Sequence, residues 1–228
     1  MLHHRCGRRW AGWLHQLDPV VIACVGCATR VLWMVLSAVC VYGVRWWLPR
    51  RMVVAMVYIG IDNGLSGALV ALDARGRLVA STPMPTVKMS KKSARRAYRP
   101  REVYLWLSQW VEGDAYVCQE TAQAFPITGK AACFSIGLGA GLIEGMLIAL
   151  SLPYQHVRPK EWQGVVLKGI PGESKERSIL KTEQAVPELD LHPLGPTDIR
   201  PKNPHDGLAD ACCLALYARW SDRGEDDG

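Results

Sequence analysis

The sequence predicts an α/β protein whose mixed sheet is flanked by helices. Two observations support this fold class. Residues 57–83 contain three strand-like apolar runs separated by short glycine-containing turns, a pattern typical of an antiparallel meander. Between about 101 and 157, helical and strand patterns alternate, as they do where helical crossovers connect parallel strands. The expected order is therefore β-β-β-α-β-α-β, followed by further helices.

The first strand is expected over Val57–Ile61, "VYIGI", because β-branched and aromatic residues follow one another there without polar interruption. Asp62 ends this run, and the turn "NGLSG" follows it. A carboxylate at the edge of a buried sheet is costly unless it has a partner. Asp62 therefore needs a hydrogen-bond donor or a metal ion.

The next elements follow from the same reasoning. "ALVALD" and "LVASTPM" are expected to be the second and third strands, joined by the turn "ARGR". An amphipathic helix is expected over about 101–112, where apolar residues recur at helical spacing. The strand "AYVCQE" follows and ends at Glu120.

A long apolar helix is expected over 131–150, with Gly137, Gly141 and Gly145 on one face. Glycine costs about 1 kcal/mol relative to alanine inside a helix, so three at this spacing indicate that another backbone comes close. That backbone could belong to the sheet, to a second subunit or to nucleic acid.

The C-terminal part is predicted to be mostly helical. "PYQHV" is a short strand, "PKEWQGVVLKG" a helical turn or two, and a helix follows with Ser174 as its N-cap. After a proline-rich loop at 193–204, the apolar helix "HDGLADACCLALYARW" ends the globular pattern.

The first 55 residues form a separate segment. Residues 19–48 are almost wholly apolar and exceed the roughly 20 residues that cross a bilayer. Three interpretations are open: a membrane anchor, a poorly ordered apolar extension, or translation from a start codon upstream of the natural one. Met52 and Met56, directly before the first strand, favour the third. The expected organisation is an extension over 1–55, a globular domain over 56–221 and an acidic tail over 222–228.

The formal net charge of +6 belongs to this extension. Residues 1–56 hold seven arginines against Asp18 alone, while acidic and basic residues balance in the remainder. The overall charge is therefore a poor argument for nucleic-acid binding, and local patches have to be considered instead.

The cysteines indicate buried reduced thiols rather than a disulfide scaffold. Four of them fall inside apolar runs of the globular part: Cys118, Cys133, Cys212 and Cys213. Cys24 and Cys27 form a CxxC pair, which lacks the second pair or the histidines of a zinc site. We expect a cytoplasmic protein.

A strongly basic segment covers residues 88–101 and has no acidic residue. We predict that it is an arm that contacts DNA phosphates, with a solvated surface loop as the alternative. Tyr98 within it could stack on a base or sugar. The predicted phosphate contacts are Lys88, Lys91, Lys92, Arg95, Arg96, Arg99 and Arg101.

Four acidic residues form the candidate catalytic site. Asp62 and Glu120 each end a strand, so they lie at one sheet edge if those strands are neighbours; Asp206 and Asp210 share a face of the last helix. Clustered carboxylates repel one another, and divalent cations relieve that repulsion. Oxygen ligands select Mg²⁺ or Mn²⁺, and two ions roughly 3.5–4 Å apart suit phosphodiester cleavage. The structural alternatives are an N-cap for Asp206 and a lysine partner for Glu120.

From about Val57 to Trp220 the chain resembles the RuvC-type Holliday-junction resolvases, in particular the short versions of phages and prophages. The resemblance rests on the order and spacing of "IGIDNGLSGALV", "CQETAQAFP", "SIGLGAGLIEGMLIALSLPYQHVRPKEWQ", "GESKERSIL" and "HDGLADACCLALYA". It implies an RNase H-like fold, a homodimer, Mg²⁺ dependence and paired symmetric nicks across a four-way DNA junction.

The resemblance also assigns roles to residues. Asp62, Glu120, Asp206 and Asp210 would be metal ligands. Lys175 falls where the family places a basic residue near the scissile phosphate, and Lys168 is a weaker candidate for a similar role.

The chain departs from the family in its last helix. Many members space the final two ligands three residues apart, whereas here Gly207 occupies that place. His205 is a further candidate ligand. The N-terminal extension has no counterpart in the family.

Three other functions fit parts of the pattern. A flap or branched-DNA endonuclease would use the same metal-dependent phosphodiester cleavage. A junction-binding module would bind the DNA without cleaving it. "GIDNGLSG" also resembles the phosphate hairpin of actin-like sugar kinases and ATPases, which need a second glycine-rich phosphate loop. No loop of that form occurs in the sequence from Val57 to Gly228.

Overall fold

The computed structural model describes residues 56–90, 95–123, 127–194 and 201–224. The N-terminal extension, the CxxC pair within it, Lys91 and Lys92 lie outside the described residues, as does the end of the predicted acidic tail.

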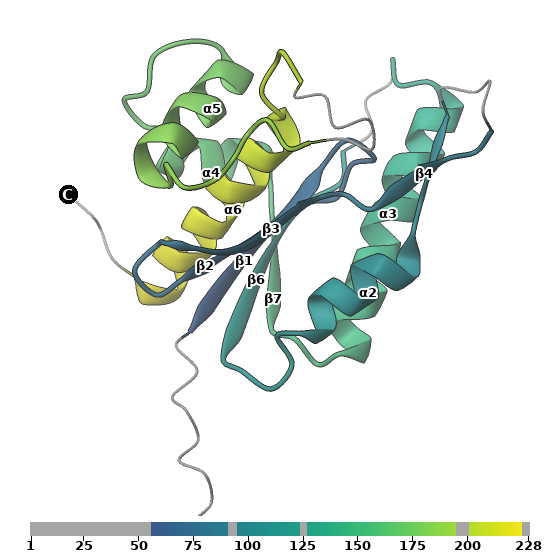
Figure 1. Ribbon diagram of the computed structural model, residues 1–228, viewed down its shortest axis with the longest axis horizontal. Helices are drawn as coiled ribbons and strands as arrows, with labels where there is room; N and C mark the ends of the chain where they lie inside the picture. Colours follow the sequence, from purple (N-terminus) through teal and green to yellow (C-terminus); the bar gives the residue numbers. More distant parts are fainter. Residues whose placement is uncertain (1–55, 91–94, 124–126, 195–200, 225–228) are drawn as a thin grey trace, which may run out of the picture. The chain divides into compact units, whose positions relative to one another are not determined.

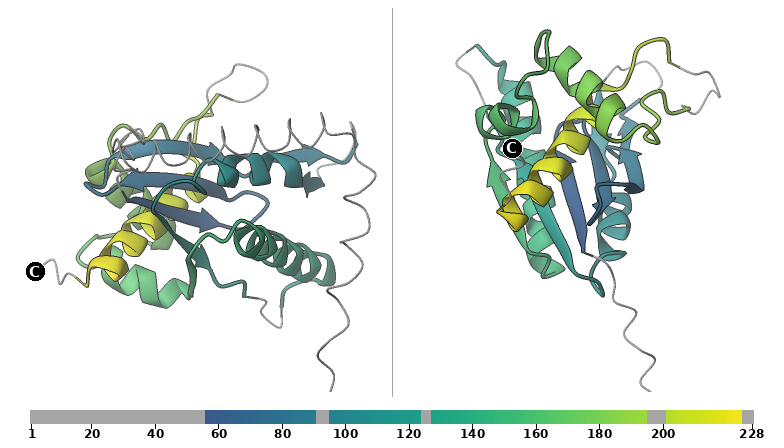
Figure 2. Two further views of the ribbon diagram at one scale, coloured as in Figure 1. Left: turned by 90° about the horizontal axis from the view of Figure 1, so that it is seen from below. Right: turned by 90° about the vertical axis from the view of Figure 1, so that its left-hand side faces the viewer.

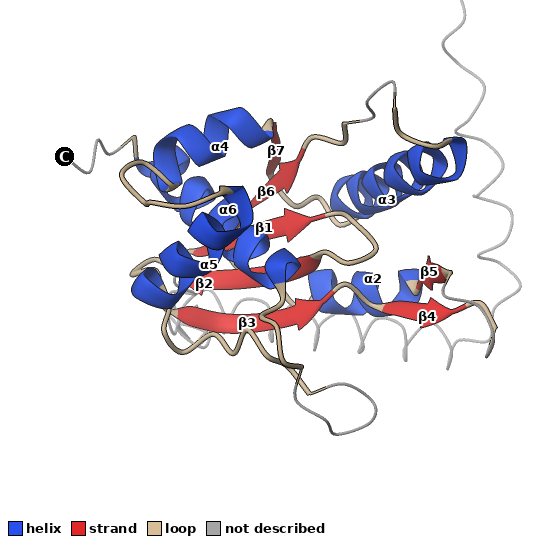
Figure 3. Ribbon diagram, turned by 90° about the horizontal axis from the view of Figure 1, so that it is seen from above, coloured by secondary structure: helices blue, strands red, loops and turns tan. Residues whose placement is uncertain are grey.

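Five strands form one mixed sheet in the order β3-β2-β1-β6-β7 (Figure 3). Its first three strands are antiparallel neighbours, and β6 and β7 then add in parallel. This confirms the expected RNase H-like arrangement. The strands are β1 (Val57–Asp62), β2 (Ala68–Asp73), β3 (Leu78–Pro83), β6 (Ala115–Glu120) and β7 (Tyr154–Val157).

Helices cover both faces of this sheet (Figures 1 and 2). One face packs against α2 and α3, and the other against α6, on which α4 and α5 lie in turn. The helices are α2 (Pro100–Ser108), α3 (Lys130–Ala149), α4 (Pro159–Val166), α5 (Ser174–Ala185) and α6 (Asp206–Arg223).

The alternation of side chains along β1 explains this layering. Ile59 and Ile61 are fully buried in the core cluster that includes α2 and α3, whereas Tyr58 belongs to the cluster on the α6 side. Gly60 lies directly beneath α6, because a Cβ on it would be 2.0 Å from the backbone oxygen of Ala211. The absence of a side chain at Gly60 therefore lets α6 cross close to the sheet.

Several boundaries differ from the sequence-based expectation. α2 ends at Ser108 rather than near 112, and hydrogen-bonded turns follow it. The N-cap of α5 is Glu173 instead of Ser174, because Glu173 and Glu176 form a reciprocal capping box. α6 continues to Arg223, past the expected domain end at 221.

The basic segment 88–101 is not simply a loop. Its first residue and its residues 96–98 take part in a short antiparallel hairpin of β4 (Thr86–Lys88) and β5 (Arg96–Tyr98). We call this element the basic hairpin.

The prediction for the cysteines is confirmed where it can be examined. Cys118, Cys212 and Cys213 are buried and Cys133 is partly buried, and all four are free thiols.

Candidate active site

The two strand-end acids lie side by side. β1 and β6 are parallel neighbours, and Ile61 is in register with Gln119. Asp62 and Glu120 are the next residues of their strands, so both emerge at the same edge of the sheet. The condition on which the predicted site depended is therefore met.

The first turn of α6 packs onto the turn that follows Asp62. A Cβ on Gly207 would lie 2.4 Å from the backbone oxygen of Ser66, and one on Gly67 would lie 2.1 Å from that of Asp62. This close approach brings the beginning of α6 to the sheet edge. It also leaves no room for a side chain at position 207.

Three of the carboxyl groups share one electrostatic environment. Burial raises the pKa of Asp62, and the charge of Asp206 raises it further, although the Gly64 N–H donates to Asp62 Oδ1 over 3.0 Å. Burial raises the pKa of Glu120 to about 7, with contributions from the charges of Asp62 and Asp210. Burial likewise raises the pKa of Asp210 to about 6, aided by the charges of Asp62 and Asp206. Glu120 and Asp210 thus each respond to the charge of Asp62, and Asp62 responds to that of Asp206.

Asp206 is neutralised by a lysine. Lys175, in the first turn of α5, donates from Nζ to Asp206 Oδ2 over 2.6 Å. Burial raises the pKa of Asp206, but the hydrogen bond and the charge of Lys175 outweigh it and the net pKa is lowered. The same hydrogen bond raises the pKa of Lys175, whose side chain remains 75% exposed. The predicted lysine thus lies at the mouth of the acidic cluster.

Both structural alternatives for the acids are wrong. The N-cap of α6 is His205, whose Nδ1 accepts a hydrogen bond from the Leu208 N–H over 3.1 Å, so Asp206 is not the cap. Glu120 receives its side-chain hydrogen bond from Trp162 and not from a lysine: Trp162 Nε1 donates to Glu120 Oε1 over 3.0 Å. The sequence did not single out Trp162.

The donor set fits a divalent cation in its chemistry. Asp62, Glu120 and Asp210 offer carboxylate oxygens, and their partial burial raises their pKa values. Oxygen ligands of this kind favour a hard cation such as Mg²⁺ or Mn²⁺. Among the described residues, however, no three His, Cys, Asp or Glu side chains are close enough to hold one ion. The carboxylates would therefore have to move toward one another to share it.

The basic hairpin presents only part of the predicted arm. Lys88, Arg95 and Arg101 are exposed. Arg96 donates to Thr86 Oγ1 over 2.7 Å, and Arg99 forms an ion pair with Glu102 at 2.7 Å, so the charge of Arg99 is compensated. Exposed Lys168 follows α4, with no described contact to the acids.

Tyr98 links the basic hairpin to the active-site edge. It is buried, so the stacking role considered for it is wrong. Its hydroxyl donates to the backbone oxygen of Asn63 over 2.9 Å, and Asn63 Nδ2 donates to the backbone oxygen of Glu120 over 3.0 Å. Burial and the charge of Asp62 raise the pKa of Tyr98 to about 12, so its hydroxyl stays protonated as a donor.

The glycine stripe of α3 faces away from the sheet. No atom lies within 4 Å of where a Cβ would be on Gly137, Gly141 or Gly145, whereas Ile143 and Leu147 are buried. Packing on the sheet therefore does not account for the stripe. Apolar side chains flank it in the open, with Phe134 71%, Leu138 49% and Ile148 62% exposed. By length and composition alone, this 20-residue helix could also cross a membrane.

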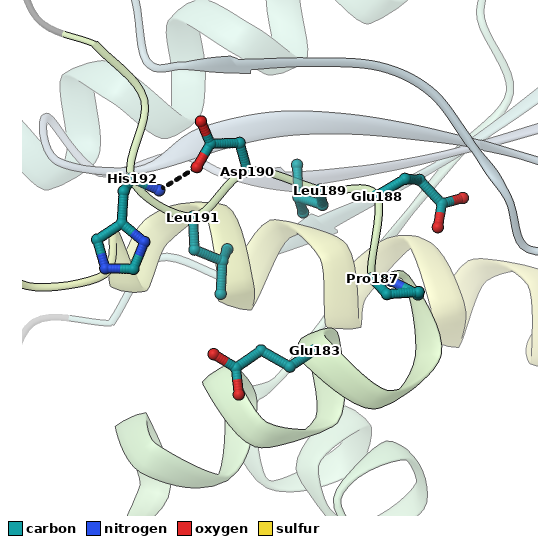
Figure 4. Close-up of a pocket in the computed structure, with 7 residues that line it drawn as sticks. All are labelled: Glu183, Pro187, Glu188, Leu189, Asp190, Leu191 and His192. Carbon is teal, nitrogen blue, oxygen red and sulfur yellow. Dashed lines mark hydrogen bonds between the residues drawn. The ribbon is translucent and has the colours of Figure 1, made fainter. Parts of the chain in front are cut away.

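A hollow of about 420 Å³ lies beside the segment that follows α5 (Figure 4). Two of its three acids accept backbone hydrogen bonds: Glu188 accepts from the Leu78 N–H and Asp190 from the His192 N–H, both over 2.9 Å. It is lined by Glu183, Pro187, Glu188, Leu189, Asp190, Leu191 and His192, none of which belongs to the predicted site.

Comparison with known proteins gives similarities in structure but none in sequence. No model of a protein family matches the chain, and no curated protein matches its sequence. A structure of T. thermophilus RuvC in complex with Holliday junction substrate has a TM-score of 0.48 at 18% identity, covering 74% of this chain and 96% of that chain. A Thermus thermophilus RuvC structure has a TM-score of 0.47 at 21% identity, covering 74% and 97%. The function of this chain has to be inferred from its own residues.

Proposed function

We propose that this chain is a divalent-metal-dependent endonuclease that resolves four-way DNA junctions by paired nicks. The observation that carries the proposal is the convergence of Asp62, Glu120 and Asp210 from two parallel strands and one helix, with Lys175 beside them. Clustered, half-buried carboxylates next to an exposed ammonium suit hydrolysis of a phosphodiester.

The site would hold Mg²⁺ or Mn²⁺, and we propose two ions. Their ligands would be Asp62, Glu120, Asp206 and Asp210. When bound, such ions supply an activated water and stabilise the leaving oxygen in an in-line displacement. The products would carry a 5′ phosphate and a 3′ hydroxyl.

Lys175 would leave its ion pair with Asp206 to meet a phosphate oxygen. Its ammonium is exposed and already lies at the acids, so a small rotation of the side chain redirects it. Once the charge of Asp206 is shared with a cation, the ammonium is free to balance the charge that develops on the phosphate. Electrostatic donors of this kind contribute about two to three powers of ten in rate.

The basic hairpin would hold a duplex arm through its phosphates. Exposed Lys88 and Arg95 supply charge on the described part of this element, and exposed Arg101 adds to it from the start of α2. Contacts of this type orient DNA without reading its sequence. Binding should therefore weaken steeply with salt.

Paired nicks require two active sites, and we propose that α3 pairs with α3 of a second copy. Its exposed residues 134, 138, 141, 145 and 148 alternate in steps of four and three, which is the spacing of a helix–helix seam. In an antiparallel pair centred on Gly141, Phe134 would lie opposite Ile148, and Gly137 opposite Gly145. The seam is thus self-complementary, as a two-fold interface must be.

Cleavage of four-way, flap and linear DNA in Mg²⁺ tests the proposal. We expect symmetric, ligatable nicks in the four-way junction, and their loss in Asp62→Asn and Glu120→Gln. Preferential cutting of the flap would identify a flap endonuclease, and binding without cutting a junction-binding module. ATP turnover, or thermal stabilisation by nucleotide, would favour the kinase-like function. Undiminished cutting by both variants would refute the site.

A further inference from the structure

Trp162 is placed to control the geometry of Glu120. Its side chain is 1% exposed, and its Nε1 donates to Glu120 Oε1 over 3.0 Å. The contact joins α4 to the end of β6, 42 residues away in the sequence. Glu120 thereby receives a donor from the core on a carboxyl group that also responds to the charges of Asp62 and Asp210.

The indole ring is held rigidly. It packs in a cluster that includes Val157, Val166 and Leu214, drawn from β7, α4 and α6. The helix that carries it starts with proline, and its first turn is held by Glu161, which accepts from the Arg158 backbone N–H over 3.0 Å and forms an ion pair with the Arg158 guanidinium. The direction of the Trp162 N–H, and with it the rotamer of Glu120, is therefore determined by surroundings that do not belong to the acidic cluster.

The kind of donor matters as much as its position. Lys175 neutralises Asp206, whereas an indole N–H carries no charge and only donates. A neutral donor can orient a carboxylate without removing the negative charge that attracts a cation. Outer hydrogen bonds of this type commonly fix the orientation of metal-binding side chains.

We propose that Trp162 is a positioning residue, which through its hydrogen bond to Oε1 orients the carboxylate of Glu120, one of the residues that with Asp62 and Asp210 would hold a divalent cation. The inference rests on the proposed function, because it assigns a metal to this site. It adds a residue outside the carboxylate and lysine set.

Direct Mn²⁺ binding without DNA tests this role, with Trp162→Phe as the variant. Phenylalanine keeps an aromatic ring in the core and removes the N–H. We expect the dissociation constant for Mn²⁺, measured by calorimetry, to rise about 10-fold, the lower end of the range for such outer contacts. The Mg²⁺ concentration that half-saturates junction nicking should rise in parallel.

Trp110→Phe is the matched control. Trp110 Nε1 is also buried but has no hydrogen-bond partner in the described part of the chain, so the same substitution removes an N–H that makes no contact. It should leave Mn²⁺ affinity unchanged. Equal affinity in wild type and Trp162→Phe would overturn the inference, whereas a wild type that neither binds Mn²⁺ nor cuts DNA would overturn the proposed function instead.

Nuclear magnetic resonance of the indole N–H groups covers the case in which Trp162→Phe does not fold. In folded wild-type protein, the indole signal that shifts on Glu120→Gln substitution should be the one that Mn²⁺ broadens most. If the signal that responds to Glu120→Gln is unaffected by Mn²⁺, Trp162 does not sense the cation and the inference fails.

Discussion

Gly207 lies directly against the backbone oxygen of Ser66, so that a Cβ at position 207 would be only 2.4 Å from it. This contact sets α6 against the turn after β1 and so determines where Asp206 and Asp210 stand relative to Asp62. Neither α6 nor the turn after β1 can move away easily, because both sides of the contact are backbone atoms.

Gly207→Ala should therefore displace α6 and impair the site. Forced overpacking of this kind costs about 1–3 kcal/mol, and we expect the free energy of unfolding to fall by that amount and nicking to be lost. Gly164→Ala is the control, because Gly164 is also helical but has no atom within 4 Å of the added Cβ. Thermal melting and junction nicking would be measured for both. Equal stability and activity in the two variants would contradict the packing argument.

The buried acids predict an unusual dependence of stability on pH in metal-free protein. The pKa of Glu120 is about 7 in the folded state against 4.5 ordinarily, so between these pH values the folded protein binds more protons than the unfolded protein. The free energy of unfolding should therefore fall as pH rises through this window, by up to about 3 kcal/mol from Glu120 at 1.4 kcal/mol per pH unit. Asp210, with a pKa of about 6, adds to the fall at its lower end.

Denaturant unfolding at pH 4.5 to 8 in a chelator would measure this dependence. Glu120→Gln should show a flatter profile, because the amide does not ionise and can still accept from Trp162. Mn²⁺ should restore stability at pH 8 in wild type and much less in Glu120→Gln. Stability of the metal-free wild type that rises through the window would contradict the prediction.

Lys175 should contribute to the rate more than to DNA affinity. Lys175→Ala is expected to lower the single-turnover nicking rate by about 10²–10³ with little change in junction Kd, because one ammonium acts on developing charge. Lys160→Ala removes an equally charged, exposed lysine from α4 and should have little effect on the rate. A Lys168→Ala variant should be affected less than Lys175→Ala, since Lys168 has no described contact to the acids. If all three variants cut at the same rate, Lys175 has no special role.

Strand periodicity predicted that Asp62 and Glu120 each end a strand, but it left open whether those two strands are neighbours. The parallel pairing of β1 and β6 came from the structure. The position of α6 depended on contacts through Gly60 and Gly207 that no local pattern reveals. Trp162 was not predicted, and Tyr98 was predicted in another role, for the same reason: each contacts the site through a hydrogen bond between segments distant in sequence. In the sequence, Trp162 and Tyr98 look like ordinary core residues. Only the fold shows that the indole and the hydroxyl contact the active-site residues.

The orientation of α3 could not be predicted either. Because its residues are apolar all round, the sequence does not distinguish a core-facing side from an exposed one. The glycine that contacts the interior is Gly139, where a Cβ would lie 2.1 Å from Tyr98 Oη, and not a member of the periodic stripe. The glycine stripe predicted that one face of α3 packs closely against another backbone. It did not predict whether that backbone belongs to the sheet, to a second subunit or to nucleic acid.

The basic hairpin predicts a dependence on salt. Lys88→Ala and Arg101→Ala should each reduce the slope of log affinity against log salt by about one, if each side chain contacts one phosphate. Binding would be measured with Asp62→Asn protein, so that no DNA is cut. Glu112→Gln, which changes charge on an exposed residue beyond α2, is the control and should leave the slope unchanged. Unaltered slopes for Lys88→Ala and Arg101→Ala would exclude the hairpin from the DNA interface.

The exposed face of α3 predicts a dimer that a single charge can break. Leu138 is 49% exposed and has no role in the core, so Leu138→Glu should leave the melting temperature of the monomer unchanged while it places like charges across the two-fold seam. We expect sedimentation equilibrium to show a dimer for wild type and a monomer for Leu138→Glu. Leu105→Glu is the matched control. Leu105 is 51% exposed but lies on α2 and not on the helix that forms the seam, so this variant should remain dimeric. Paired nicking should become single, unlinked nicks in Leu138→Glu, since each monomer then carries one site. A dimer that persists in Leu138→Glu would place the subunit contact elsewhere and leave the glycine stripe to contact DNA.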